Sequence, residues 1–338
     1  MRDVLLKLTR RQDLTRDEAR AAFDAMLSGT ASDAQAAGFL MGLAVKGVAA
    51  DELAGAAGVM RERVLSIPRN ASDVVLDTCG TGGTGRDTFN VSTAAAILVA
   101  SCGVKVVKHG NRKASGISGS ADVLEVLGVR LDLPPDRLAA CLDEVGLCFA
   151  FARNHHPAMK HVAAARAALG VPTIFNLLGP LTNPARACHQ LLGVYDRKFA
   201  ILLAGVLRDT GSRRAWVVHA HDGLDELSTL GPTHVCEVMN GRIEEWTLDP
   251  ATLGIKVPPV DALRVASAAE SADCIRGIVE GRRDGRCAAV YDIAALNAAA
   301  GLVITGAAEN LAGGLDRVRA CVENGNARRT LATLTAFA

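Results

Sequence analysis

The sequence has little of what nucleic-acid and membrane proteins need. Its 37 Lys and Arg residues are balanced by 36 Asp and Glu residues, and aromatic residues make up only 4% of the 338 positions. A nucleic-acid surface normally carries a basic excess, and single-strand binding also uses aromatic stacking. We expect the apolar stretch near residues 36–45 to be the longest, and it ends at Lys46, too short to span a bilayer. The expected partners therefore include no nucleic acid and no membrane.

We also expect neither an export signal nor a cysteine framework. Charged residues interrupt the N-terminal segment 1–13, where a secretory signal needs an apolar core, so we expect a cytoplasmic location. The nine cysteines are scattered singly, with no C-x-x-C pair and mostly apolar neighbours. Buried free thiols in a reducing cytoplasm are favoured over disulfides or zinc ligands.

The sequence pattern changes near residue 70, which divides the chain into two parts. The first seventy residues are typical of helices, with capping boxes predicted for Thr15 with Glu18 and for Ser32 with Gln35. After a linker at 66–68, short β-branched runs alternate with helical stretches, which predicts a mostly parallel sheet covered by helices. The expected strands include 74–77, 104–107, 129–131, 174–176 and 215–219. We also expect a helix over 135–142 and helices again from residue 266 onward.

A glycine-rich segment, Asp77-Thr-Cys-Gly-Thr-Gly-Gly-Thr-Gly85, follows the first predicted strand. A strand, a glycine turn and a helix N-terminus form an anion site, because free backbone N–H groups and the helix dipole point the same way. The glycines also match G-x-G-x-x-G, but no acidic residue lies between Asp87 and Asp122 to bind the ribose of a dinucleotide. A tight turn followed by a helix that Ser92 and Thr93 merely cap is the structural alternative.

A basic segment about twenty-five residues further on, 108–122, has the same setting after a second strand. Lys108, Arg112 and Lys113 lie within six positions there, and Ser120 is placed to cap the next helix. Charge-assisted hydrogen bonds to phosphate are about twice as strong as neutral ones. A solvated loop with incidental charges is the alternative. Two such segments favour a substrate with more than one phosphate.

An acidic pair, Asp225 and Glu226, follows the predicted strand 215–219. Magnesium is usually bound by one or two carboxylates together with substrate phosphates. Taken alone, two neighbouring acids are more often a solvated turn.

With these three segments the chain resembles the anthranilate phosphoribosyltransferase family. The resemblance runs in family order from about residue 5 to residue 335. The matching motifs are Gly80-Thr-Gly-Gly83, Thr88-Phe-Asn-Val-Ser-Thr93, Lys108-His-Gly-Asn-Arg112, Ser118-Gly-Ser-Ala-Asp-Val-Leu-Glu125, His155-His-Pro-Ala-Met-Lys-His-Val162, Phe175-Asn-Leu-Leu-Gly-Pro-Leu-Thr-Asn-Pro184 and Asp222-Gly-Leu-Asp-Glu226.

The resemblance implies an α/β fold class: a small all-helical domain plus a large α/β domain with a mostly parallel central sheet flanked by helices. The helical domain would span 1–68, completed by helices from the middle of the chain, and the phosphoribosyl diphosphate-binding domain 69–338. The implied reaction transfers the phosphoribosyl group of 5-phosphoribosyl 1-diphosphate to the amine of anthranilate, the second step of tryptophan biosynthesis from chorismate. It also implies a homodimer through the helical domain, and Mg2+, up to two ions per monomer.

The family's functional residues carry over onto matching positions. Those implied as catalytic are Lys108, Asn111 and Arg166. Those implied to bind phosphoribosyl diphosphate are Gly80, Gly83, Thr84, Thr88, Asn90, Val91, Ser92, Thr93, Lys108, His109, Gly110, Asn111, Arg112, Lys113, Ala114, Ser115, Gly116 and Ser120. Gly80, Asn111 and Arg166 are implied to contact anthranilate, and Ser92, Asp225 and Glu226 to bind magnesium.

Three positions depart from the family pattern. Thr84 stands where an aspartate is common, and Gly116 and Ile117 replace a serine and a basic residue. Losing a hydroxyl and a cation should weaken phosphate binding, whereas losing the acid removes a repulsion. The alternatives are a pyrimidine-nucleoside phosphorylase, a catalytically silent paralogue that binds phosphorylated ligands or nucleic acid, and a transferase for another aromatic amine.

Overall fold

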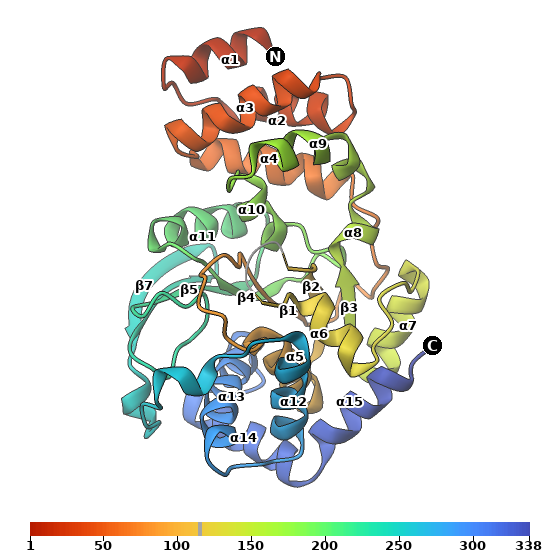
Figure 1. Ribbon diagram of the computed structural model, residues 1–338, viewed down its shortest axis with the longest axis vertical. Helices are drawn as coiled ribbons and strands as arrows, with labels where there is room; N and C mark the ends of the chain where they lie inside the picture. Colours follow the sequence, from red (N-terminus) through yellow and green to blue (C-terminus); the bar gives the residue numbers. More distant parts are fainter. Residues whose placement is uncertain (114–116) are drawn as a thin grey trace.

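The computed structural model describes residues 1–113 and 117–338, and its N-terminal part is helical (Figure 1). The predicted capping boxes are confirmed, because Thr15 and Ser32 are N-caps whose side chains accept from the backbone N–H groups of Glu18 and Gln35. The helices of this part are α1 (Arg2–Thr9), α2 (Arg16–Leu27), α3 (Asp33–Lys46) and α4 (Ala50–Glu62).

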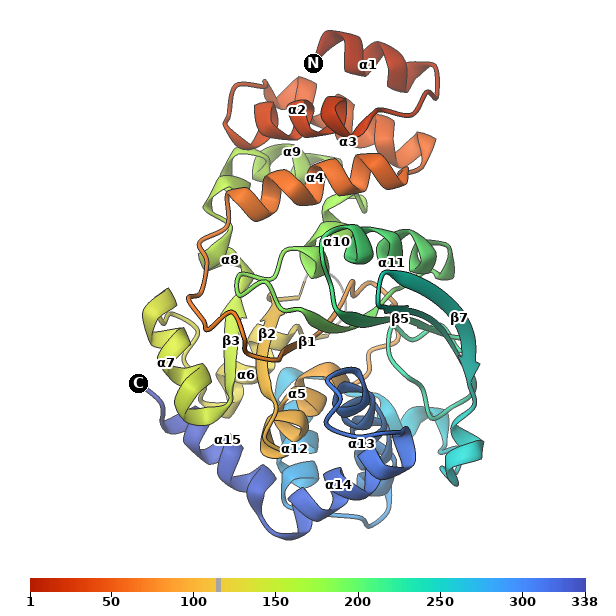
Figure 2. The same ribbon diagram turned by 180° about the vertical axis from the view of Figure 1, so that it is seen from behind.

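Helices from the middle of the chain pack on these four (Figures 1 and 2). Helix α9 (Ala163–Leu169) contacts α3, and α10 (Phe175–Leu178) contacts α4. The shared core contains Phe23, whose ring meets Phe39 and Phe175 edge-on at centroid distances of 5.5 and 5.6 Å. Aromatic rings prefer this arrangement because the positive edge of one faces the negative face of the other. The helical core therefore includes residues far beyond the first seventy.

The second part is built on a seven-stranded sheet in the order β3-β2-β1-β4-β5-β6-β7. The first five strands in this order are parallel and the last two are antiparallel, so the predicted mostly parallel sheet is confirmed. The strands are β1 (Val75–Gly80), β2 (Lys105–Gly110), β3 (Leu147–Phe151), β4 (His189–Gly193), β5 (Arg214–Ala220), β6 (Thr233–Met239) and β7 (Arg242–Leu248).

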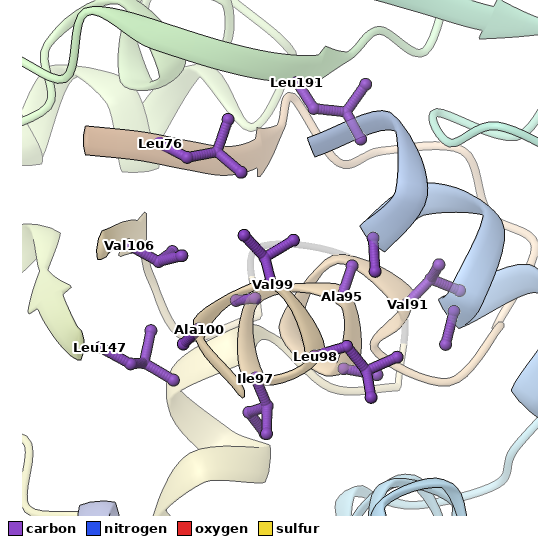
Figure 3. Packing of buried hydrophobic residues seen from close by; sticks show 14 of the residues in the cluster. Leu76, Val91, Ala95, Ile97, Leu98, Val99, Ala100, Val106, Leu147 and Leu191 are labelled. Atoms are coloured by element: carbon purple, nitrogen blue, oxygen red, sulfur yellow. The ribbon is translucent and has the colours of Figure 1, made fainter. Parts of the chain in front are cut away.

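Helices cover both faces of the sheet (Figure 2). The face away from the helical part is covered by α5 (Val91–Ser101) and the C-terminal helices, and the face toward it by α11 (Ala200–Asp209). Figure 3 shows Val99 of α5 beneath Leu76 and Val106 of the sheet. The remaining helices are α6 (Ser120–Leu127), α7 (Pro135–Val145), α8 (Ala152–His155), α12 (Ala268–Val279), α13 (Arg286–Ile304), α14 (Leu311–Glu323) and α15 (Asn326–Ala336).

Several local predictions are wrong. Residues 129–131 form no strand. Ile174 is the N-cap of helix α10, which begins at Phe175, and the Thr173 N–H donates to Asn176 Oδ1. Runs of three residues are too short to separate a strand from a helical turn. Ser120 does not cap α6: it is the first helical residue, and Gly119 is the N-cap. The predicted helix at Pro135 is confirmed, as are the C-terminal helices.

The stretch 36–45 lies within α3, and a longer helix, α13, also has an apolar composition. Helix α13 has 19 residues, and an 18-residue stretch of it has a mean hydropathy of 1.7. By length and composition alone, this helix could span a bilayer. However, 83% of that stretch is buried inside the fold, as in a core helix. Asn297 in this helix is buried and bonds to the backbone of Leu227 through both its Oδ1 and Nδ2 atoms.

Candidate active site

The three segments singled out in the sequence meet around one cavity of about 290 Å3. The glycine-rich segment leaves the end of β1 and the basic segment leaves the end of β2, while the acidic pair lies beyond β5. The carboxyl ends of parallel strands lie at one edge of a sheet, where ligands bind in α/β folds. The predicted site residues that line the cavity are Gly80, Gly83, Thr84, Thr88, Asn90, Val91, Ser92, Lys108, His109, Gly110, Asn111, Arg112, Lys113, Ser120, Asp225 and Glu226.

Lys108 forms the buried base of this cavity. Its Nζ atom donates to the Thr78 carbonyl oxygen at 2.6 Å and to Ser92 Oγ at 3.0 Å. The side chain is only 3% exposed, and burial lowers the pKa of Lys108 while nearby carboxylates oppose that shift. These bonds fix the ammonium group between β1 and the first turn of α5, so little ordering remains to be done when an anion arrives.

The neighbouring residues on β1 and β2 point to the opposite face of the sheet, because side chains alternate along a strand. There Asp77 Oδ1 accepts from the His109 N–H at 3.1 Å, and Oδ2 accepts from Asn183 Nδ2 at 2.8 Å. His109 lies between the Gly179 carbonyl oxygen (3.0 Å) and His156 Nε2 (3.2 Å). Burial holds the pKa of His109 well below its usual value and lowers the pKa of His156 to about 4. Both rings are therefore neutral near pH 7.

The acidic pair is fixed by backbone donors from the glycine-rich segment and α5. Asp225 Oδ2 accepts from the Gly82 N–H at 3.0 Å, and Glu226 Oε1 accepts from the Ser92 N–H at 3.2 Å. Burial raises the pKa of both carboxyls, and together with the charge of Asp225 it brings the pKa of Glu226 to about 8. Crowded carboxylates of this kind are stabilised by a cation. Their oxygens, with Ser92 Oγ nearby, form the hard donor set that suits magnesium.

Asn90 joins the glycine-rich segment to the basic one. Its Oδ1 atom accepts from Ser118 Oγ at 2.8 Å and from Ser271 Oγ at 2.7 Å. Asn90 is also the N-cap of α5, and Gly119 is the N-cap of α6, so two helix N-termini border the same cavity. The positive ends of two helix dipoles favour an anion with separated phosphates.

Comparison with known proteins agrees with this geometry. Residues 2–64 match the helical bundle domain of a glycosyl transferase family, and residues 72–328 match its a/b domain. The anthranilate phosphoribosyltransferase of Methylobacterium nodulans is 51% identical over 98% of this chain and 97% of its own length. The chain belongs to the anthranilate phosphoribosyltransferase family.

Solved structures of the family share the whole architecture. The anthranilate phosphoribosyltransferase of Thermus thermophilus superposes with a TM-score of 0.91 at 40% identity, covering 99% of both chains. The Saccharomyces cerevisiae enzyme in complex with PRPP and Mg has a TM-score of 0.84 at 26% identity, covering 95% of this chain and 91% of its own. The same enzyme in complex with 4-fluoroanthranilate gives 0.87 at 26% identity, covering 99% and 96%.

Two of the residues carried over from the family lie away from the cavity, as far as residues 1–113 and 117–338 define it. Thr93 is buried inside α5. Arg166 lies on α9 in the helical part, with its guanidinium 5.0 Å from the ring centre of Phe175, and burial lowers its pKa. Ala114, Ser115 and Gly116 lie outside the described residues.

Arg112 lines the cavity but is engaged by α6. Its guanidinium bonds to both oxygens of Glu125, at 2.7 and 2.9 Å, and to Asp122 Oδ1 at 3.1 Å. These contacts raise the pKa of Arg112, with Glu125 the larger cause. A phosphate must therefore compete with two carboxylates for this side chain.

The sequence analysis missed several residues that line the cavity. Arg86 extends from the glycine-rich segment and reaches the backbone at Gly223, where a Cβ atom would lie 2.9 Å from its guanidinium nitrogen. Asn176 of α10 lines the cavity from the helical side. Arg86 could have been noticed as the cation that directly follows the glycine-rich segment, whereas nothing local in the sequence marks Asn176.

Proposed function

We propose that this protein transfers the phosphoribosyl group of 5-phosphoribosyl 1-diphosphate to the amine of anthranilate, releasing diphosphate. The observation that carries the proposal is the convergence of Lys108, two helix N-termini and the Asp225–Glu226 pair on one cavity. The relatives support the choice of substrates, because a yeast member was solved with PRPP and Mg and again with 4-fluoroanthranilate. The product, N-(5-phosphoribosyl)anthranilate, belongs to the second step of tryptophan biosynthesis.

The geometry favours electrostatic catalysis without a covalent intermediate. Negative charge develops on the diphosphate as its bond to ribose C1 breaks, and fixed donors aimed at developing charge are often the largest catalytic contribution. Lys108 Nζ is already held at 2.6 and 3.0 Å from its partners, and the backbone N–H groups of the glycine-rich segment border the same space. The amine of anthranilate is nucleophilic without a base, so alignment with C1 is the remaining requirement.

Asp225, Glu226 and Ser92 would hold magnesium. Their donor atoms are all oxygens, and both carboxyls have raised pKa values that a cation would reverse. Bound there, magnesium supplies positive charge to the diphosphate oxygens. Two carboxylates held by separate backbone donors offer room for up to two ions per monomer.

The anthranilate end of the reaction is assigned to Asn111, Gly80 and Arg166. Asn111 and Gly80 line the cavity, and Arg166 projects from the helical part with a half-buried guanidinium that could face a carboxylate. Charge-assisted pairing with Arg is well suited to a planar carboxylate. Lys108 and Asn111 would act at the reacting groups, whereas Arg166 would orient the acceptor.

A homodimer through the helical domain and a cytoplasmic location complete the proposal. Leu6 on α1, and Met41 and Val45 on α3, are exposed large apolar side chains on helices that contact each other. Exposed apolar side chains on two packed helices favour a protein partner there. Sedimentation of the purified protein over a range of concentrations tests the dimer.

The decisive experiment follows the loss of anthranilate fluorescence in the presence of phosphoribosyl diphosphate and magnesium. The control reactions contain EDTA, or the variant Asp225→Asn. Decay that requires magnesium and is strongly reduced in the variant supports the proposal. Folded protein without decay would overturn it, and cleavage of thymidine or uridine with inorganic phosphate would identify a nucleoside phosphorylase instead.

A further inference from the structure

Three side chains of the types that bind metals lie together on the β6–β7 hairpin, at the opposite edge of the sheet from β3. Cys236 of β6 pairs directly with Glu245 of β7, and His234 lies two residues before Cys236. Residues paired across an antiparallel ladder share a face, and so do residues i and i+2 of one strand. All three side chains therefore project from the same side of the hairpin.

The donor atoms are spaced like three corners of a metal tetrahedron. His234 Nε2 lies 3.1 Å from Glu245 Oε2 and 3.4 Å from Cys236 Sγ, and the sulfur lies 3.8 Å from the same carboxylate oxygen. Tetrahedral zinc bound to N, O and S at its usual bond lengths keeps these atoms roughly 3.4–3.6 Å apart. Small adjustments of side-chain torsions would close the difference.

We propose that His234, Cys236 and Glu245 form a binding site for a divalent cation of the zinc class, with a fourth position filled by water. Imidazole and thiolate are ligands that select zinc-like ions, whereas the all-oxygen set at Asp225 and Glu226 suits magnesium. The proposal therefore separates two cation sites by ligand chemistry, and it does not depend on the proposed transferase activity.

Charge and burial are compatible with this assignment. One thiolate and one carboxylate neutralise a divalent ion, so the filled site carries no net charge. Burial lowers the pKa of His234, which keeps the imidazole neutral and able to coordinate, while burial and Glu245 raise the pKa of Cys236 to about 12. The cation must therefore displace the thiol proton, which is released to solvent.

The surroundings leave a path for a cation to enter the site but also place a positive charge near it. His234 and Cys236 are buried, but the Glu245 side chain is 52% exposed, so an ion can enter from that side. The positive charge of Arg197 also lowers the pKa of His234 and would reduce the affinity for a cation. His219 lies opposite His234 on β5, with its Nδ1 atom 2.8 Å from the Val194 carbonyl oxygen.

The consequence of filling the site is a cross-link between two strands. β7 ends the sheet and is paired only with β6 among the described strands, and most of its side chains are exposed. A cation shared by Cys236 and Glu245 would hold this edge in register. The sequence analysis favoured thiols without zinc because it found no C-x-x-C pair, and strand pairing supplies the proximity that sequence spacing does not.

The test uses Co2+ alone as the probe, because thiolate coordination gives an intense near-ultraviolet absorption that carboxylates and imidazoles do not. We expect one equivalent of Co2+ to produce this band in the full chain and Zn2+ to abolish it by competition. Cys236→Ser should lose the band, and Glu245→Gln should weaken Co2+ binding by roughly tenfold or more. At one Zn2+ concentration, the rise in Tm should also be larger for the unmodified chain than for Glu245→Gln.

Cys188→Ser is the matched control, since Cys188 Sγ also lies close to an imidazole nitrogen, 3.2 Å from His189 Nδ1, but outside the hairpin. This variant should keep the band. Loss of the band in Cys188→Ser, or equal Co2+ affinity in Glu245→Gln and the unmodified chain, overturns the proposal. Glu245 is exposed, so its variant should remain folded even if Cys236→Ser does not, and its magnesium-dependent activity should be unchanged.

Discussion

The end of β4 lies so close to the backbone at Asp225 that Gly193 has no room for a side chain. A Cβ atom on Gly193 would lie 1.6 Å from the carbonyl oxygen of Asp225. Gly80, at the end of the neighbouring strand β1, has a similar restriction, because a Cβ atom there would lie 2.7 Å from Asp225 Oδ2. Glycine is therefore required at the ends of two strands, because Asp225 occupies the space that a side chain would fill at either position.

Gly193→Ala should displace the loop that carries Asp225. We expect a stability cost of roughly 1–3 kcal/mol, as for other overpacked sites, together with a rise in the magnesium concentration needed for half-maximal activity. Measuring activity against magnesium concentration checks this. Gly205→Ala in α11 is the control, since no atom lies within 4 Å of a Cβ built there. Equal magnesium requirements in the two variants would contradict the argument.

Lys108→Ala should lower kcat/KM for phosphoribosyl diphosphate by roughly 10²–10³-fold, the loss seen when a fixed donor to developing charge is removed. Lys105→Ala is a matched control on the same strand. Lys105 pairs at the surface with Asp73 and Asp143, at 2.8 and 2.7 Å, and such exposed pairs contribute little. Steady-state kinetics of both variants test this prediction. Comparable losses of kcat/KM in the two variants would contradict a direct role of Lys108 in the site.

The buried imidazole of His156 should make the protein sensitive to acid. Its pKa is about 4 in the folded state, below the usual value of 6.5, so the unfolded chain binds more protons between these limits. Stability from this group is complete above pH 6.5 and is lost as the pH falls toward 4, by up to about 3 kcal/mol. Urea unfolding at several pH values should show a shallower acid dependence for His156→Gln than for the unmodified chain. Identical slopes would mean that other groups control acid unfolding.

Arg166→Ala should affect the acceptor rather than the phosphorylated substrate. Loss of one charge-assisted contact predicts a KM for anthranilate raised roughly 10- to 100-fold, with kcat/KM for phosphoribosyl diphosphate little changed. Arg153→Ala, an exposed arginine after β3, serves as the control. The reverse pattern, with the phosphorylated substrate affected, would mean that the two subsites are exchanged.

Ile117→Lys should restore a cation to the edge of the cavity, where Ile117 is partly exposed. We expect the KM for phosphoribosyl diphosphate to fall roughly twofold to fivefold, as for a solvent-screened pair. Arg86→Ala should raise the same KM, because Arg86 is the cation that the glycine-rich segment places there. An unchanged or higher KM for Ile117→Lys contradicts the first expectation, and an unchanged KM for Arg86→Ala contradicts the second.

The parts of the fold that follow local rules could be predicted from the sequence. Capping at Thr15 and Ser32 depends on residues three apart, and the glycine-rich segment after Val75 depends on a continuous motif. Strands β3, β4, β6 and β7 were not among the predicted strands. Of these, β3 and β4 are short and buried along their whole length, without the alternation that marks a half-exposed strand. Local periodicity cannot separate such runs from buried helix.

The candidate site likewise has a part that could be predicted from the sequence and a part that could not. Motif resemblance placed Lys108, Asp225 and Glu226 at one site, and the structure brings them around one cavity. The contacts that support them could not be predicted, because Asp77 and Asn183 are 106 residues apart and meet only through tertiary packing. The position of Arg166 relative to the cavity likewise depends on how α9 packs against α3.

The bond between the Ser92 N–H and Glu226 Oε1 joins residues 134 positions apart. Contacts with such long sequence separation form late, because the chain must pay the entropy of closing a large loop before it gains them. Magnesium-dependent activity should therefore be among the last properties to return during refolding, after helix content and core burial. Magnesium-dependent activity therefore reports that folding is complete, and a truncated or partly folded chain should show none.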